Sequence, residues 1–183
     1  MEQSTDTLIF IPDISGFSSF VSEVAINHSE HIIRELLEVI MDSNDLGLIV
    51  SEIEGDAVLF FKSDDLPSLP RLLQTVEQLF IRFHEHLLLY KTNRLCQCGA
   101  CQTAHDLNLK VIVDQGYVKK MQVKDHQKLV GPAVIAAHRL LKNNIPSDNY
   151  LLLSDRYMQL HQSELKTSQL EWLDWQEGQS TFE

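Results

Sequence analysis

The sequence lacks the features of a membrane protein, a disulfide-rich protein or a secreted protein. It contains only three cysteines, all between Cys96 and Cys101, and an odd, clustered set does not form a disulfide framework. No apolar run is long enough to cross a bilayer, and the polar N-terminus does not resemble a secretory signal. These absences favour a cytoplasmic protein with no membrane partner.

Basic residues are also scarce. The chain has 15 lysines and arginines against 26 acidic residues, which gives a formal net charge of −11. Binding to nucleic acids depends mainly on neutralising phosphates with lysine and arginine. The composition therefore argues against a nucleic-acid partner.

No linker rich in proline or glycine divides the chain, because its five prolines and seven glycines are scattered. A length of 183 residues suits one well-buried core and is too short for two ordinary ones. We predict a single domain over residues 1–183, with a cysteine-containing loop at 95–105 and a weakly patterned tail from about 163.

Apolar patterning predicts an α+β fold. Helical spacing begins near Ser15 and again near Ser29, and it continues over residues 69–91 and 131–141. Strand-like segments cover residues 8–11, 46–50, 57–61, 107–113, 116–123 and 150–153. The order βααββαββαβ is that of a ferredoxin-like antiparallel sheet, with helices packed on it and one additional helix.

Two aspartates are candidate metal ligands. Asp13 ends the first predicted strand, and Asp56 lies in the turn between the next two. Taken singly, each is more often a helix cap or a turn residue. On neighbouring strands, however, they could share Mg²⁺ or Mn²⁺ with a phosphate. Backbone N–H groups at a helix start could receive that phosphate; they belong to Ile14, Ser15, Gly16 and Phe17.

Three segments resemble the catalytic domains of class III adenylyl and guanylyl cyclases. They are Phe10-Ile-Pro-Asp-Ile-Ser-Gly-Phe-Ser19, Glu54-Gly-Asp-Ala-Val-Leu-Phe-Phe61 and Gly131-Pro-Ala-Val-Ile-Ala-Ala-His-Arg-Leu140. They occur in the family's order, and the similarity covers roughly residues 7–153. The chain most resembles an uncharacterised bacterial branch of that superfamily, a DUF2652-like group.

This resemblance implies roles for particular residues. Asp13 and Asp56 would be the two metal aspartates, assisted by the carbonyl of Ile14. Arg139 would stabilise charge on the transferring phosphoryl group. The family works as a dimer in which the metal ligands of one chain face the arginine of the other, so the resemblance also implies a homodimer.

Three positions depart from the cyclase pattern. Ile135 replaces the asparagine that orients the ribose in active members. Lys128 and Glu52 stand at the two base-reading positions, without the usual combination of residues. A missing positioned hydrogen bond at such a site typically costs about 10²–10³ in rate, so these changes argue against ordinary cyclase turnover.

The cysteine loop is a second candidate metal site. Cys96, Cys98 and Cys101 are closely spaced, and His105 is a possible fourth ligand. Such a set could bind Zn²⁺ tetrahedrally, but it lacks the second ligand pair of an ordinary zinc motif. Reduced, partly buried thiols are the alternative interpretation.

The sequence leaves three functional hypotheses. The first is a divergent cyclase-like domain that binds a nucleotide or other phosphate ligand through a divalent cation, with ordinary cyclase turnover lost or altered. The second is an active nucleotidyl cyclase, a phosphorus–oxygen lyase, with atypical base and ribose contacts. The third is a non-catalytic dimerisation or interaction domain.

Overall fold

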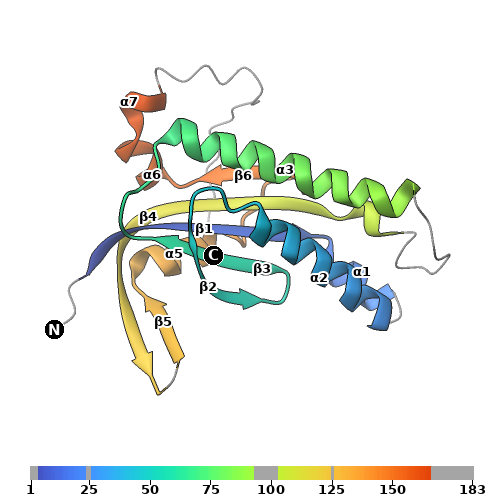
Figure 1. The fold of residues 1–183 in the computed structure, drawn as a ribbon. Coiled ribbons are helices and arrows are strands. Elements are labelled where there is room, and N and C mark those ends of the chain that lie inside the picture. Colours follow the sequence, from blue (N-terminus) through green and yellow to red (C-terminus); the bar gives the residue numbers. More distant parts are fainter. Residues whose placement is uncertain (1–3, 24–25, 93–102, 125, 166–183) are drawn as a thin grey trace.

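The computed structural model describes residues 4–23, 26–92, 103–124 and 126–165. The elements as far as β6 follow the predicted order, and two short helices come after them (Figure 1). The strands are β1 (Thr5–Ser15), β2 (Ile49–Glu54), β3 (Ala57–Lys62), β4 (Asn108–Val123), β5 (His126–Val130) and β6 (Tyr150–Leu153). The helices are α1 (Phe17–Glu23), α2 (Ile26–Asp42), α3 (Leu69–Thr92), α5 (Pro132–Leu140), α6 (Asp155–Leu160) and α7 (Gln162–Leu165), with a 3₁₀ turn at Ala104–Asp106.

The strands form one sheet in the order β2-β3-β1-β4-β5, and β6 pairs with β4 beyond that path. All pairs are antiparallel except β4 with β6, which run parallel. Helices α2 and α3 cover one face of the sheet, and α5 lies against the other (Figure 1). The predicted α+β class is confirmed, with one parallel strand pair added to the antiparallel sheet.

Strand β4 corrects one predicted boundary. The sequence predicts two strands at residues 107–113 and 116–123, but β4 runs continuously from Asn108 to Val123. Its last five residues, Lys119 to Val123, pair with β5. The polar residues between the two segments are not a turn. Asp114 is fully buried and accepts hydrogen bonds from Ser154 and Arg156. Gly116 leaves room for Arg156, whose guanidinium would lie 2.6 Å from an added Cβ.

Strand β2 begins later than the predicted segment 46–50. The side-chain amide of Asn44 bonds both the N–H and the carbonyl of Leu48, which holds the preceding residues in a loop. Leu46 and Leu48 are nevertheless buried in the core, so their apolar character reflects packing of the loop. After β6 the chain forms α6 and α7, which extend to Leu165, and most of the predicted tail lies outside the described residues.

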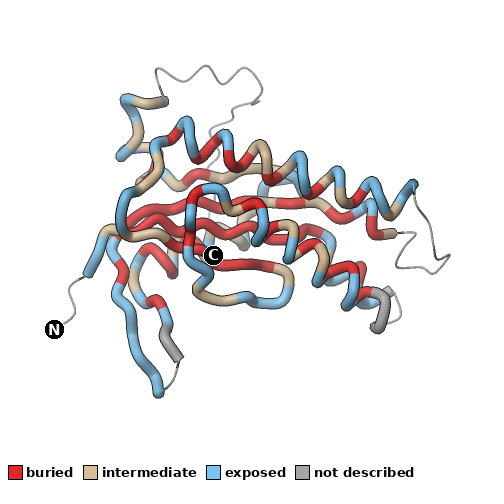
Figure 2. Tube along the Cα trace, in the orientation of Figure 1, coloured by how far each residue is buried: buried red, intermediate tan, exposed pale blue. Residues whose placement is uncertain are grey.

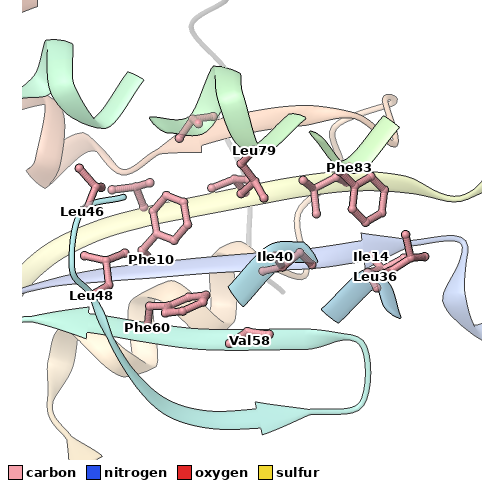
Figure 3. Close-up of a cluster of buried hydrophobic side chains, with 14 of the residues drawn as sticks. Phe10, Ile14, Leu36, Ile40, Leu46, Leu48, Val58, Phe60, Leu79 and Phe83 are labelled. Atoms are coloured by element: carbon pink, nitrogen blue, oxygen red, sulfur yellow. The ribbon is translucent and has the colours of Figure 1, made fainter. Parts of the chain in front are cut away.

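Successive side chains along each strand point to opposite faces of the sheet, so the buried residues form two core layers. One set packs beneath α2 and α3, as Figure 3 shows for Phe10, Ile14, Val58 and Phe60. The other set lies on the face covered by α5 and includes Ile9, Ile11, Leu59 and Ile112. The central strands are buried along most of their length (Figure 2). Among the described residues, no helix is long and apolar enough to span a membrane.

Tyr157 on α6 provides a test of this packing. Its side chain is fully buried, and its hydroxyl has no hydrogen-bond partner within the described part of the chain. An unsatisfied buried hydroxyl costs about 1–3 kcal/mol. We therefore expect Tyr157→Phe to leave the free energy of unfolding unchanged or to raise it by about 1 kcal/mol in urea titrations.

Tyr150→Phe is the matched control, because the Tyr150 hydroxyl accepts a 2.7 Å hydrogen bond from Asn143. Losing that bond should lower the free energy of unfolding by about 0.5–1.5 kcal/mol. A loss at Tyr157→Phe as large as that at Tyr150→Phe would contradict the assignment of an unpaired hydroxyl.

Candidate active site

Asp13 lies near the end of β1 on the face of the sheet that α5 covers. Ile9 and Ile11 belong to the core layer on that face, and Asp13 continues the same alternation. It pairs in register with Ala57 of β3 and Lys110 of β4. The residue is only 9% exposed, so the chain places a carboxylate where its pattern otherwise places isoleucine.

Asp56 precedes β3 in the tight turn after β2. Gly55 has a φ of +61°, which suits glycine in a tight turn. The Ile14 N–H donates a 3.1 Å hydrogen bond to the Asp56 carbonyl, which joins the turn to β1. Asp13 and Asp56 therefore lie at the same end of adjacent strands, as predicted.

Both aspartates line one open cleft of about 660 Å³ between the sheet and α5. The cleft carries three acidic side chains, three lysine or arginine side chains and the imidazole of His138. The acidic residues are Asp13, Glu54 and Asp56, and the lysine and arginine residues are Lys110, Arg139 and Lys142. Its charges therefore balance, although the chain as a whole is strongly acidic.

Lys110 is the residue of this cleft that the sequence analysis missed. Its Nζ lies 3.3 Å from Oδ1 of Asp13, and the two side chains are 22% and 12% exposed. The available signal was a lysine inside an otherwise apolar strand, between Leu109 and Val111. Within a predicted strand, such a lysine lies on the face opposite its buried neighbours and needs an anionic partner if it is partly buried.

The two aspartates have raised pKa values for different combinations of causes. Burial raises the pKa of Asp13, and the Lys110 ammonium opposes that shift. Burial also raises the pKa of Asp56, and the negative charge of Asp13 raises it further. Ionisation of Asp13 therefore disfavours ionisation of Asp56.

Helix α5 adds Ile135 and Arg139 to the cleft. The two residues are four positions apart, so they share a face of the helix. The Ile135 side chain is 55% exposed and lines the cleft. Arg139 is exposed and lines the same cleft as the two aspartates of its own chain.

The donors in the cleft fit a hard divalent cation. Among the described residues, no three His, Cys, Asp or Glu side chains are grouped so that they could hold a metal ion. Mg²⁺ does not require such a cage, because it usually binds one or two carboxylates together with water and substrate phosphates. Asp13 and Asp56 match that requirement, so the role of the pair as Mg²⁺ or Mn²⁺ ligands stays a prediction that the geometry permits.

The predicted phosphate site at the N–H groups of Ile14, Ser15, Gly16 and Phe17 needs correction at its first member. The Ile14 N–H is already bonded to Asp56, and Ser15 belongs to β1 instead of opening a helix. Gly16 has a φ of +87° and leads into α1, where the half-buried Phe17 packs against the core. The Ile14 N–H is therefore unavailable to a phosphate, because β1 continues to Ser15, four residues beyond the predicted segment 8–11.

The remaining predicted residues lie outside the cleft lining. Glu52 on β2 and Lys128 on β5 form an ion pair with one another, at 3.5 Å. His105 lies in the 3₁₀ turn, with its Nε2 3.4 Å from Asp106. Cys96, Cys98 and Cys101 lie outside the described residues, so zinc binding stays a prediction.

Comparison with known proteins identifies the family. Residues 33–150 match the family described as "Protein of unknown function (DUF2652)". The chain belongs to the DUF2652 family. The matched segment includes Asp56, Lys110 and Arg139, but it begins after Asp13.

One relative of this DUF2652 protein is the uncharacterized protein Rv2561/Rv2562 of Mycobacterium tuberculosis. The two are 31% identical over 121 residues, which is 66% of this chain and 56% of the relative. The chain thus spans little more than half the length of that relative.

Solved cyclase structures share the fold of this DUF2652 protein. The adenylyl cyclase CyaB from P. aeruginosa superposes with a TM-score of 0.65 at 16% identity, covering 89% of this chain and 83% of the cyclase. The guanylyl cyclase Cya2 gives 0.64 at 12% identity, covering 87% and 80%. A dimeric guanylyl cyclase domain from the fungus Blastocladiella emersonii gives 0.61 at 17% identity, covering 89% and 88%. The fold implied by the three motifs is confirmed.

The raised pKa of Asp56 makes a prediction about stability. A raised pKa means that the folded chain binds this proton more tightly than the unfolded chain, so ionisation at neutral pH weakens folding. We expect Asp56→Asn to increase the free energy of unfolding at pH 7 in urea titrations. The gain should shrink as the pH falls and vanish below about 4, where the unfolded carboxyl also becomes protonated.

Asp64→Asn is the control, because Asp64 lies exposed in the segment after β3. It should change stability little at either pH. A loss of stability in Asp56→Asn at pH 7, or a gain that persists unchanged at acid pH, would contradict the electrostatic account.

Proposed function

We propose that this DUF2652 protein is a divergent cyclase-like domain that binds a nucleotide or another phosphate ligand through a divalent cation, with ordinary cyclase turnover lost or altered. The observation that carries the proposal is the composition of one cleft. It combines two adjacent carboxylates, Asp13 and Asp56, with the cations Lys110 and Arg139. Carboxylates suit a divalent cation, and lysine or arginine suits the phosphate that shares it.

Each group in the cleft has a distinct task in this proposal. Asp13 and Asp56 would hold Mg²⁺ or Mn²⁺, which would neutralise phosphate charge and act as a Lewis acid. Arg139 lies on the opposite wall, on α5, and would contact phosphate oxygens through its guanidinium. The volume of about 660 Å³ falls within the usual range of small-molecule pockets, about 300–1,000 Å³.

The residue at position 135 supports the proposal that cyclase turnover is lost or altered. In the cyclases that the chain resembles, an asparagine at this position orients the ribose. The isoleucine here has no hydrogen-bonding group, yet it is 55% exposed on the cleft wall beside Arg139. Cyclisation requires the 3′-hydroxyl to be aligned with the α-phosphorus, and a misplacement of about 1 Å can cost roughly 10²-fold.

The base-reading positions support the same conclusion. Glu52 and Lys128 are paired with each other at 3.5 Å, so a base would have to compete with that ion pair for either side chain. The identity of the base is therefore left open in the proposal.

The proposal includes a homodimer. On the outer half of β4, Tyr117, Met121 and Val123 share one side of the strand and are exposed by 63%, 42% and 49%. This part of β4 extends with β5 away from the helices (Figure 1) and is exposed along much of its length (Figure 2). An exposed apolar stripe on a projecting hairpin suits contact with a second copy.

Metal-dependent ligand binding is the direct test. In calorimetric titrations, the wild-type protein should bind ATP or GTP with Mn²⁺ present and lose that binding in EDTA. Asp56→Asn should weaken binding at least about tenfold, because it removes one charged ligand. Glu54→Gln, a cleft carboxylate on the exposed strand end, should have a smaller effect. Equal nucleotide affinity with and without metal would refute the proposal.

Cyclase turnover is expected to be weak. Purified protein with Mn²⁺ and ATP or GTP should form cyclic nucleotide at least about 10²-fold more slowly than an active class III cyclase domain assayed in parallel. Mass spectrometry of the products measures this. Robust cyclic nucleotide formation that Asp13→Ala abolishes would instead establish an active cyclase with atypical contacts.

A further inference from the structure

Lys110 is mostly buried beside Asp13 in the cleft, unlike an ordinary surface lysine. It lies directly opposite Asp13 in the β1–β4 register, and its Nζ is 3.3 Å from the Asp13 carboxylate. Its side chain is 22% exposed, so most of it is packed within the structure. The ammonium group therefore occupies a position beside Asp13 where a bound cation would otherwise lie.

The other carboxylate of the pair is not compensated in this way. Among the described residues, no lysine, arginine or histidine forms an ion pair with Asp56, although three lysine or arginine side chains line the cleft. The two aspartates thus differ: Asp13 forms an ion pair with Lys110, whereas burial and the negative charge of Asp13 raise the pKa of Asp56 and the more weakly acting Lys110 ammonium only partly opposes this.

Charge decides how many metal ions such a site can hold. Two carboxylates carry two negative charges, and Lys110 already supplies one positive charge. The two carboxylates and the ammonium together carry one negative charge, and one divalent cation changes this to one positive charge. A second divalent cation would be repelled by that positive charge at short range. We propose that the cleft holds a single divalent cation at Asp13 and Asp56 and uses the Lys110 ammonium as its second positive charge.

This inference rests on the proposed function, since it concerns the cation that Asp13 and Asp56 would hold. It differs from a purely structural role, in which Lys110 only compensates a buried carboxylate. The structural role predicts that replacing Lys110 changes stability but leaves the number and affinity of bound metal ions unaltered. The cation role predicts that the lysine competes with the metal for Asp13.

The experiment is a Mn²⁺ titration followed by electron paramagnetic resonance, using Mn²⁺ alone as the probe. Ions at the site are counted as those lost in Asp56→Asn. Wild-type protein should bind a single such ion per chain. Lys110→Gln, which keeps a hydrogen-bonding group beside Asp13, should bind Mn²⁺ at least about tenfold more tightly, because a neighbouring positive charge is gone.

Lys142→Gln is the matched control. It removes the same charge from the same cleft, but Lys142 forms no ion pair with Asp13 or Asp56 among the described residues. Its effect on Mn²⁺ affinity should be clearly smaller than that of Lys110→Gln. Equal effects of the two variants, or unchanged affinity in Lys110→Gln, would overturn the inference.

Ion counting with the wild-type protein tests the inference even if Lys110→Gln does not fold. Two Mn²⁺ ions per chain that depend on Asp56 would overturn the single-cation site while leaving the proposed metal-dependent function intact. Absence of Mn²⁺ binding in both wild type and folded Lys110→Gln would overturn the proposed function together with this inference.

Discussion

Asp13 places a carboxylate among isoleucines on the α5 face of the sheet, and the rest of the cleft is arranged around that charge. A buried carboxylate is strongly destabilising unless it is compensated. Lys110 supplies the compensation from the adjacent strand, in direct register, at 3.3 Å. Because β1 and β4 lie in the middle of the sheet, neither residue can move away without disturbing the core on both faces.

The same constraint explains why the cleft is suited to ligands. The hydrogen bond from the Ile14 N–H to the Asp56 carbonyl holds the backbone of Asp56 next to β1, and burial and the charge of Asp13 raise the pKa of Asp56. Helix α5 then faces them with Arg139 and the exposed Ile135. Carboxylates with raised pKa values are common at functional sites, where groups that bind ligands lower the stability of the fold. The shared cyclase fold does not itself supply this argument, since it is compatible with many functions.

The sequence predicts the fold well where periodicity is strong. Helices α2 and α3 and strand β3 lie close to their predicted positions, since each has a regular apolar stripe or an unbroken apolar run. The strand boundaries are predicted wrongly where a polar residue or a glycine is required by a contact with a distant part of the chain. Asp114 and Gly116 resemble a turn, yet they accommodate Arg156 from α6, which no local pattern indicates.

In the candidate site, too, some features follow from the local sequence pattern and others depend on tertiary contacts. The adjacency of Asp13 and Asp56 follows from strand order and could be predicted. The ion pair of Asp13 with Lys110 depends on the register of β1 against β4, which strand prediction alone does not fix. The ion pair between Glu52 and Lys128 likewise depends on how β5 approaches β2.

The most direct test of the account is the position of a metal ion in the cleft. Crystals grown with Mn²⁺ and a non-hydrolysable nucleoside triphosphate should give one anomalous difference peak between the carboxylates of Asp13 and Asp56. Phosphate density should then lie between that peak and Arg139. Manganese bound elsewhere with the two aspartates unliganded, in the presence of well-ordered nucleotide, would contradict the account.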